Sequence, residues 1–241
     1  MAEVSTWSEP PASLTLATGD VHVWRLGLDQ PENVVAEFRD TLEAHELERA
    51  GRFHFEKHRT HFVVGRGGLR YVLARYLDVK PEEFRFSYGA YGKPALVSEE
   101  LSFNMSHSHD LALFAVAADR ELGVDVERIR ADFASEDIAR RFFSRGEVAA
   151  FNALDKEEQV AAFFRCWTRK EAYIKAIGRG LSEPLDAFDV TLAPGEAALL
   201  RAERGDTSRW AMFDIDAGDG YAAALAVEMP VSGIRYWQIL S

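Results

Sequence analysis

The chain has 241 residues, of which 47% are hydrophobic, and a formal net charge of −11. This length and apolar content suffice for a large core in one domain or in two half-size lobes. The negative charge argues against nucleic acid or an anionic membrane as the main partner. The single cysteine, Cys166, excludes an internal disulfide and fits a reducing compartment. The sequence shows no signal-peptide pattern and no apolar run long enough to span a membrane, so we expect a cytoplasmic protein.

The first half of the chain is predicted to alternate strands and helices. Residues 2–20 are polar and expected to be extended or frayed. The regular elements follow in the order strand 21–26, helix 31–42, helix 59–77, strand 84–88 and strand 101–106. The glycines at 65, 67 and 68 fall inside the second helix, where close packing against a neighbour would explain them. They do not form a phosphate-binding loop, because no strand precedes them and no Lys-Ser/Thr follows.

Basic residues gather in one segment of this acidic chain. Between Arg49 and Tyr76 there are seven Lys or Arg and one acid, a balance of +6, so the remaining residues carry −17. Such a segment is either a solvated helix face or a pocket for a polyanionic small molecule.

The second half is predicted to be a β-hairpin, three helices and four strands. The hairpin consists of strands 111–116 and 122–127, and the helices cover 135–143, 146–154 and 157–177. The last strands are 188–192, 210–215, 221–227 and 234–240. The order strand, long helix, strands thus occurs in both halves, which is weak sequence support for a repeat.

Three acids in this half have no evident structural role. Asp125 and Glu127 lie two residues apart in strand 122–127, so the alternation of a strand puts both carboxylates on one face. Glu171 interrupts the apolar stripe of helix 157–177, where a lone buried carboxylate is costly. Because hard oxygen ligands suit Mg²⁺ with phosphate oxygens completing the octahedron, we expect Asp125, Glu127 and Glu171 to bind Mg²⁺.

Each of these features alone has an ordinary explanation. Two acids on a strand are usually a solvated face, and Glu171 has an ion-pair partner four residues on in Lys175. The occurrence of both features in one chain, with Trp167 at the start of the segment that contains Glu171, favours the metal site.

The two acidic motifs resemble those of the 4′-phosphopantetheinyl transferases of the surfactin-synthetase-activating (Sfp) type. Gly123 to Glu127 match Gly-(Val/Ile)-Asp-x-Glu, and Trp167 to Lys175 match Trp-(Ser/Thr/Cys)-x-Lys-Glu-(Ala/Ser)-x-x-Lys, with 44 positions from Glu127 to Glu171. The resemblance runs from about residue 49 to 190, and further matches are Tyr91-Gly92-Lys93-Pro94, Phe103-Asn104-Met105-Ser106-His107-Ser108, Phe142-Phe143-Ser144 with Glu147, and Gly178-Arg179-Gly180-Leu181-Ser182 with Pro184-Leu185.

This resemblance implies an α+β fold of two similar α/β lobes related by a pseudo-twofold, with the active site in the cleft between them. We expect an N-terminal lobe over residues 1–119 that contains the basic, coenzyme A-binding segment. A C-terminal lobe over residues 120–241 would carry the metal-binding and catalytic motifs.

The resemblance also implies the reaction: Mg²⁺-dependent transfer of 4′-phosphopantetheine from coenzyme A to a serine of an apo acyl, aryl or peptidyl carrier protein, with release of 3′,5′-ADP. Glu171 is the candidate to accept the serine proton, and Lys175 to neutralise charge on the departing phosphate. The residues expected to bind coenzyme A are Arg52, Arg59, Lys93, Ser106, His107 and Lys175.

A monomer is expected, with no nucleic-acid or membrane partner. The carrier is expected to meet an apolar patch with a few cations around Phe142, Phe143 and Arg145, where helical geometry allows one phenylalanine to be buried and the other exposed. Two alternatives stay open: another Mg²⁺-dependent phosphoryl-group enzyme, which would usually carry a Walker or kinase-type loop, and a catalytically silent carrier-binding module, which would lack an acid.

Overall fold

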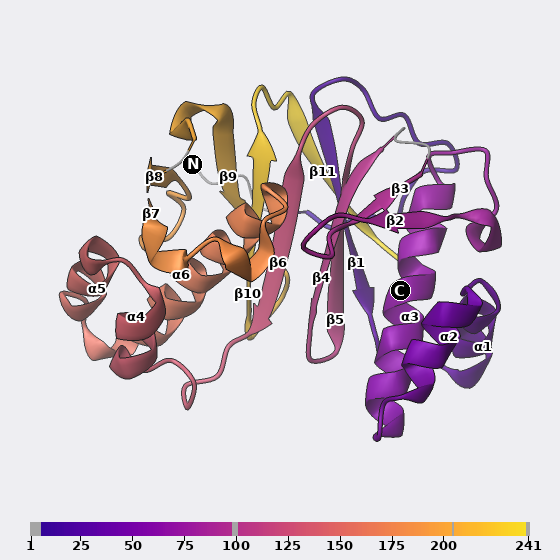
Figure 1. Cartoon of the computed structure of the whole chain (residues 1–241), viewed down its shortest axis with the longest axis horizontal. Helices are drawn as coiled ribbons and strands as arrows, with labels where there is room; N and C mark the ends of the chain where they lie inside the picture. The colour runs from indigo at the N-terminus through magenta and orange to yellow at the C-terminus, as the bar shows by residue number, and fades with distance from the viewer. Residues whose placement is uncertain (1–5, 98–100, 204, 240–241) are drawn as a thin grey trace.

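Two β-sheets, each covered by a long helix, form the framework of the computed structural model, which describes residues 6–97, 101–203 and 205–239 (Figure 1). The first sheet has the strand order β11-β1-β5-β4, with bounds Gly233–Gln238, Asp20–Gly27, Leu111–Ala117 and Ser102–Ser108. The second has the order β6-β10-β9, with bounds Leu122–Arg128, Tyr221–Glu228 and Trp210–Asp214. Two small sheets pair β2 with β3 (Phe86–Tyr88 and Pro94–Leu96) and β7 with β8 (Phe188–Val190 and Leu199–Ala202). The predicted α+β class is confirmed.

Helix α3 (Glu56–Ala74) packs closely against the first sheet and against α1, because two of its glycines leave room for side chains of these neighbours. A Cβ on Gly67 would lie 2.3 Å from Cβ of Phe38 in α1 (Glu32–Asp40). A Cβ on Gly68 would lie 2.5 Å from Cδ2 of Leu26 in β1. The close packing predicted from the sequence is therefore confirmed at these two positions, whereas a Cβ on Gly65 would make only ordinary contacts, the nearest at 3.7 Å with Cε of Met105.

Helix α2 (Ala44–Gly51), which is short and largely polar, is not among the predicted elements. It is joined to α3 by buried ion pairs, with the carboxylate of Glu46 2.5 Å from Arg66 and 2.6 Å from Arg70. Arg70 is 0% exposed. Two cations of the basic segment are thus structural groups inside the first half of the molecule, paired with Glu46 and, for Arg70, also with Glu43 at 3.3 Å.

The second lobe is covered by α6 (Lys156–Ala176), with α4 (Glu136–Phe142) and α5 (Arg145–Asn152) beside it. The strand β10 turns Ala222, Ala224 and Ala226 toward the core that contains α6, and its intervening residues toward the opposite face. This alternation follows from the two-residue period of a strand, and small alanines allow the helix to lie close to the sheet.

The faces of the two sheets that point away from the long helices share one apolar core. Val21 and Val23 of β1 and Leu113 of β5 contribute from the first sheet, and Val124 and Leu225 from the second. The edge strands β4 and β6 consequently lie next to each other at the centre of the molecule, with α3 and α6 on either side (Figure 1).

The predicted hairpin of strands 111–116 and 122–127 is wrong. Strand β5 pairs with β1 on one side and β4 on the other, so it has no free edge for the next strand. Strand β6 instead pairs with β10 in the second sheet. The sequence placed both strands correctly, but two adjacent apolar strands do not specify which edge each one meets.

The last strand in the sequence returns to the first sheet, where β11 pairs in parallel with β1. The division into two lobes at residue 119 remains a prediction. Because β11 pairs with β1, residues 233–238 lie beside the first strand of the chain. Within the parts of the chain that the structure describes, no helix has the length and apolarity needed to cross a membrane.

Candidate active site

Strand β6 presents its two acids toward α6. Val124 and Val126 belong to the core between the sheets, so Asp125 and Glu127 point to the opposite face, as the predicted alternation requires. Asp125 is only 3% exposed, whereas Glu127 is partly exposed. A buried carboxylate beside a partly exposed one indicates a specific polar site rather than a solvated strand face.

Gly123 allows α6 to lie directly on this strand. A Cβ at Gly123 would be 2.2 Å from the carbonyl oxygen of Ala172 and 2.4 Å from the backbone nitrogen of Ala176. The helix can therefore approach only because this residue has no side chain. The approach brings Glu171 and Lys175, one turn apart on α6, against the face of β6 that carries the acids.

Lys175 pairs with Asp125 rather than with Glu171. Its Nζ lies 2.6 Å from Oδ1 of Asp125 and 2.8 Å from Oγ of Ser106 in β4. The simple helix-spacing explanation of Glu171, an ion pair with Lys175, is not what the structure forms. The predicted site residues Ser106, Asp125, Glu171 and Lys175 are brought together from three elements.

The carboxylates of the site repel one another. Burial raises the pKa of Glu171 to about 7, with further contributions from the negative charges of Asp125 and Glu127. The pKa of Glu127 is also raised, first by burial and then by Asp125. Oxygen Oδ2 of Asp125 is buried without a hydrogen-bond partner. A buried carboxylate oxygen with no donor, next to two acids of raised pKa, is the environment that a divalent cation would relieve.

The donor set therefore fits a hard cation, since all three groups are carboxylates. As the side chains stand, however, no three His, Cys, Asp or Glu groups among the described residues are positioned to hold a metal ion. Lys175 supplies the positive charge nearest to Asp125 in this arrangement. The metal role of Asp125, Glu127 and Glu171 remains a prediction.

His107 connects this site to the basic segment. The pKa of His107 is lowered, first by the surrounding protein and then by the charges of Lys175, His61 and Arg49. The charge of Lys175 on α6 and the charges of His61 on α3 and Arg49 on α2 therefore all act on the His107 imidazole. Arg49 is not among the predicted site residues, because helix α2 is not predicted. Recognition of a helix over Ala44–Gly51 would have placed Arg49 and Arg52 on one helical face, since residues three apart in a helix are neighbours.

The predicted coenzyme A cations do not line one common pocket. Arg52 is 73% exposed at its side chain, pairs with Glu48 and lines a hollow with Arg49. Arg59 donates to the carbonyl oxygen of Phe53 and lines a separate hollow with residues of α1, α2 and α3.

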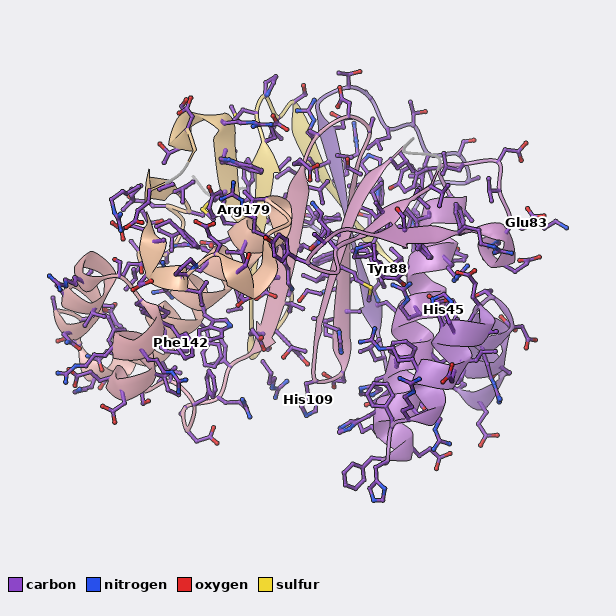
Figure 2. The ribbon with its side chains drawn as sticks, viewed as in Figure 1. His45, Glu83, Tyr88, His109, Phe142 and Arg179 are labelled. Atoms are coloured by element: carbon purple, nitrogen blue, oxygen red, sulfur yellow. The ribbon has the colours of Figure 1, made fainter. Side chains whose placement is uncertain are left out.

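Lys93 bridges the two lobes from the turn between β2 and β3. Its Nζ lies 2.6 Å from Oε2 of Glu121, 2.9 Å from the carbonyl oxygen of Ala176 and 3.3 Å from that of Leu122. It also lines a pocket of about 820 Å³ with Tyr88 and Arg179, which Figure 2 labels on opposite lobes. The ammonium group therefore caps the carboxyl end of α6, besides being available at a pocket wall.

Comparisons with known proteins point to one family. A sequence model of the 4′-phosphopantetheinyl transferase superfamily matches residues 121–226, and one described as 4′-phosphopantetheinyl transferase, N-terminal, matches residues 31–120. The 4′-phosphopantetheinyl transferase HetI of Nostoc sp. (strain PCC 7120 / SAG 25.82 / UTEX 2576) is 41% identical over 92% of this chain and 93% of HetI. The 4′-phosphopantetheinyl transferase Sfp of Bacillus subtilis (strain 168) is 31% identical over 84% of this chain and 88% of Sfp. Among solved structures, the chain is similar to the Thermotoga maritima holo-[acyl-carrier-protein] synthase over 45% of this chain and 62% of that one, at 23% identity and a TM-score of 0.36.

The chain belongs to the 4′-phosphopantetheinyl transferase superfamily, since these matches extend over most of its length. The resemblance to Sfp-type enzymes that its motifs predicted is confirmed, and so is the enzyme class, a phosphopantetheinyl transferase.

Proposed function

We propose that this enzyme transfers the 4′-phosphopantetheine group of coenzyme A to a serine of an apo acyl, aryl or peptidyl carrier protein, with Mg²⁺ bound and 3′,5′-ADP released. We propose further that it acts as a monomer in the cytoplasm. The buried, unpaired Cys166 suits a reducing compartment, and burial raises the pKa of its thiol well above the usual value, so it has no place in the chemistry.

One observation supports the proposal best. Asp125, Glu127 and Glu171 converge from β6 and α6, and Oδ2 of Asp125 is buried without a partner. We assign these three carboxylates as the Mg²⁺ ligands. When bound there, Mg²⁺ would neutralise the pyrophosphate of coenzyme A.

The protein residues divide the remaining work. The serine hydroxyl of the carrier attacks the β-phosphorus of coenzyme A, and the bond from this phosphorus to the 3′,5′-ADP oxygen breaks. Glu171, beside the metal, takes the serine proton. Lys175, held by Asp125 and Ser106, presents its ammonium to the charge that develops on the departing phosphate.

Coenzyme A is proposed to lie between the lobes, along the line from Lys175 past His107 to the basic segment. The charges of Lys175 and Arg49, from different halves of the chain, both lower the pKa of His107, which supports this path. We keep Arg52, Arg59, Lys93 and Ser106 as candidate contacts. Lys93 would exchange part of its present contact with Glu121 for a phosphate oxygen.

The carrier is proposed to dock at the end of α4. Phe143 is buried, whereas Phe142 is partly exposed, rests edge-on against Trp167 at 5.5 Å and has the guanidinium of Arg141 over its ring at 5.2 Å. Figure 2 labels Phe142 on α4, at the left of the view. Arg145, the first residue of α5, is exposed nearby in sequence. An aromatic ring with cations around it is the composition expected of a contact for an acidic helical carrier.

The test is direct. The protein is incubated with coenzyme A, Mg²⁺ and a panel of apo carrier proteins, and intact-protein mass spectrometry checks whether each carrier gains one phosphopantetheine. Asp125→Ala and Glu127→Ala should abolish the gain while the far-ultraviolet circular dichroism stays that of the wild type. Unchanged transfer by either variant would contradict the metal assignment.

A further inference from the structure

The neighbouring strands β4 and β6 are joined by hydrogen bonds that involve side chains instead of backbone-to-backbone hydrogen bonds. These strands belong to different sheets, and no backbone hydrogen bond is found between them in the described parts of the chain. Instead, the backbone N–H of Val124 donates to Oδ1 of Asn104 at 2.9 Å. Four residues further along both strands, the backbone N–H of Arg128 donates to Oγ of Ser108 at 3.1 Å. Two side chains of β4 thus take the part that carbonyl groups play in a normal sheet.

The same face of β4 holds the two acids of β6. Oγ of Ser106 lies 2.8 Å from Oδ1 of Asp125, and Oγ of Ser108 lies 2.7 Å from Oε2 of Glu127. Residues 104, 106 and 108 share one face of β4 because side chains alternate along a strand. The register of the two strands therefore sets one hydroxyl opposite each carboxylate.

The direction of the Ser108 hydrogen bond is fixed. A backbone N–H can only donate, so the hydroxyl accepts from Arg128 and is left to donate its own proton to Glu127. A hydroxyl in this position favours the charged form of the carboxylate and restricts its rotation about one oxygen. The cost of burying Glu127 is partly offset, and its orientation is set by β4 rather than by β6 alone.

We propose that Ser108 is a positioning residue for the metal site: it joins β4 to the backbone of Arg128 and aims the Glu127 carboxylate toward the cation. This inference rests on the proposed function of the three acids as Mg²⁺ ligands. It concerns a residue to which the proposed function gives no contact with coenzyme A or with the reacting atoms. Metal sites commonly need such outer hydrogen bonds, whose loss weakens metal affinity without removing a ligand.

A purely structural role makes a different prediction. If Ser108 only fastened the lobes together, its removal would lower stability equally with and without metal, and the affinity for Mg²⁺ would not change. If it aims Glu127, affinity falls even where the protein remains folded.

Four proteins test this: the wild type, Ser108→Ala, Ser108→Thr, which keeps the hydroxyl, and Ser208→Ala as a matched control. Ser208 is exposed, and its Oγ donates to Oδ1 of Asp206 at 2.7 Å, so the control also removes a hydroxyl that bonds a carboxylate, but one outside the proposed site. Mg²⁺ binding is measured by calorimetry on each protein without coenzyme A or carrier, and melting temperatures are recorded in EDTA. The Mg²⁺ concentration for half-maximal transfer is then measured with an apo carrier.

For Ser108→Ala we expect Mg²⁺ affinity to fall by about tenfold, with a matching rise in the Mg²⁺ needed for half-maximal rate. Rescue is expected with Ser108→Thr, and Ser208→Ala should match the wild type. At saturating Mg²⁺ the kcat and the KM for coenzyme A should stay within about twofold of the wild type. Wild-type Mg²⁺ affinity in Ser108→Ala, with or without a lower melting temperature, overturns the inference while leaving the proposed function intact. Absence of both Mg²⁺ binding and transfer in the wild type would overturn the proposed function itself.

Discussion

The Cα of Gly123 faces the backbone of Ala172 so closely that a Cβ would lie 2.2 Å from the Ala172 carbonyl oxygen. This contact sets the distance between β6 and α6, and therefore the distance between the acids at 125 and 127 and the pair Glu171 and Lys175. The glycine of the Gly-Val-Asp-Val-Glu motif is thus a spacer for the active site, although it carries no functional group.

Gly123→Ala is expected to destabilise the protein by more than about 2 kcal/mol, because backbone atoms of the helix cannot move aside as a flexible side chain would. Transfer activity should fall by more than the loss of folded protein explains, because a shift of α6 also displaces Glu171 and Lys175. Urea denaturation and the mass assay measure the two effects. Gly146→Ala is the control, because there a Cβ meets nothing nearer than Oγ of Ser144 at 3.7 Å. Near wild-type stability in Gly123→Ala would show that the helix position is set elsewhere.

Glu171→Gln is expected to stabilise the metal-free protein while abolishing transfer. The pKa of Glu171 is about 7 in the folded protein against 4.5 ordinarily, so ionisation disfavours the folded state as pH rises from 4.5 to 7. The variant should exceed the wild type by about 2 to 3 kcal/mol at pH 8, but by under about 1 kcal/mol at pH 5, in EDTA. Denaturant titrations at the two pH values check this. An equal difference at both would mean that Glu171 titrates normally.

His22 is expected to make the protein less stable in acid. It is buried, donates or accepts at Nδ1 with the hydroxyl of Tyr76 at 2.8 Å, and has no partner for Nε2. Burial lowers its pKa from 6.5 to about 4, so the unfolded chain binds the proton first and stability is lost as pH falls below 6.5. Between pH 7.5 and 5 this contribution is about 2 kcal/mol. His22→Asn, which cannot titrate, should lose that slope relative to the wild type; parallel pH profiles would contradict the assignment.

Lys93→Ala is expected to raise the KM for coenzyme A by about tenfold, because a charge-assisted contact to phosphate is lost. A smaller effect with 3′-dephospho-coenzyme A would assign Lys93 to the 3′-phosphate, and equal effects to the pyrophosphate. Glu121→Gln removes the ion pair that competes with phosphate but keeps the lysine, so it should raise neither KM value and can lower both. If Lys93→Ala lowers only the free energy of unfolding, its role is limited to bridging the lobes.

Arg145→Glu is expected to raise the KM for the carrier about fivefold, corresponding to a rim contact of about 1 kcal/mol, without changing the KM for coenzyme A. Steady-state kinetics with an apo carrier measure both constants. Lys80→Glu serves as the charge-reversal control. Lys80 is exposed and lies three residues before Glu83, which Figure 2 labels at the right edge of the view, opposite Phe142. Should the coenzyme A constant move instead, or neither constant move, the carrier binds elsewhere.

The sequence by itself determined the elements that carry the site and the faces of those elements. The two-residue period of β6 and the helical period of α6 are local properties, so Asp125, Glu127, Glu171 and Lys175 could be placed on faces without knowing the fold. The spacing of the two motifs likewise sufficed to indicate the family. The buried glycines of α3 were readable because glycine inside a helix is costly unless a neighbour needs the space.

Only the tertiary structure decided which edges meet and which charges pair. Hydrophobic alternation is the same whether β6 joins β5 or β10, so the sequence predicted a hairpin where the chain changes sheets. Ion pairing depends on distances across elements: Lys175 binds Asp125 in place of Glu171, and Arg66 and Arg70 turn inward to Glu46. The hydroxyl of Ser108 faces Glu127 for the same reason, because its position follows from how the edges of two separate sheets meet.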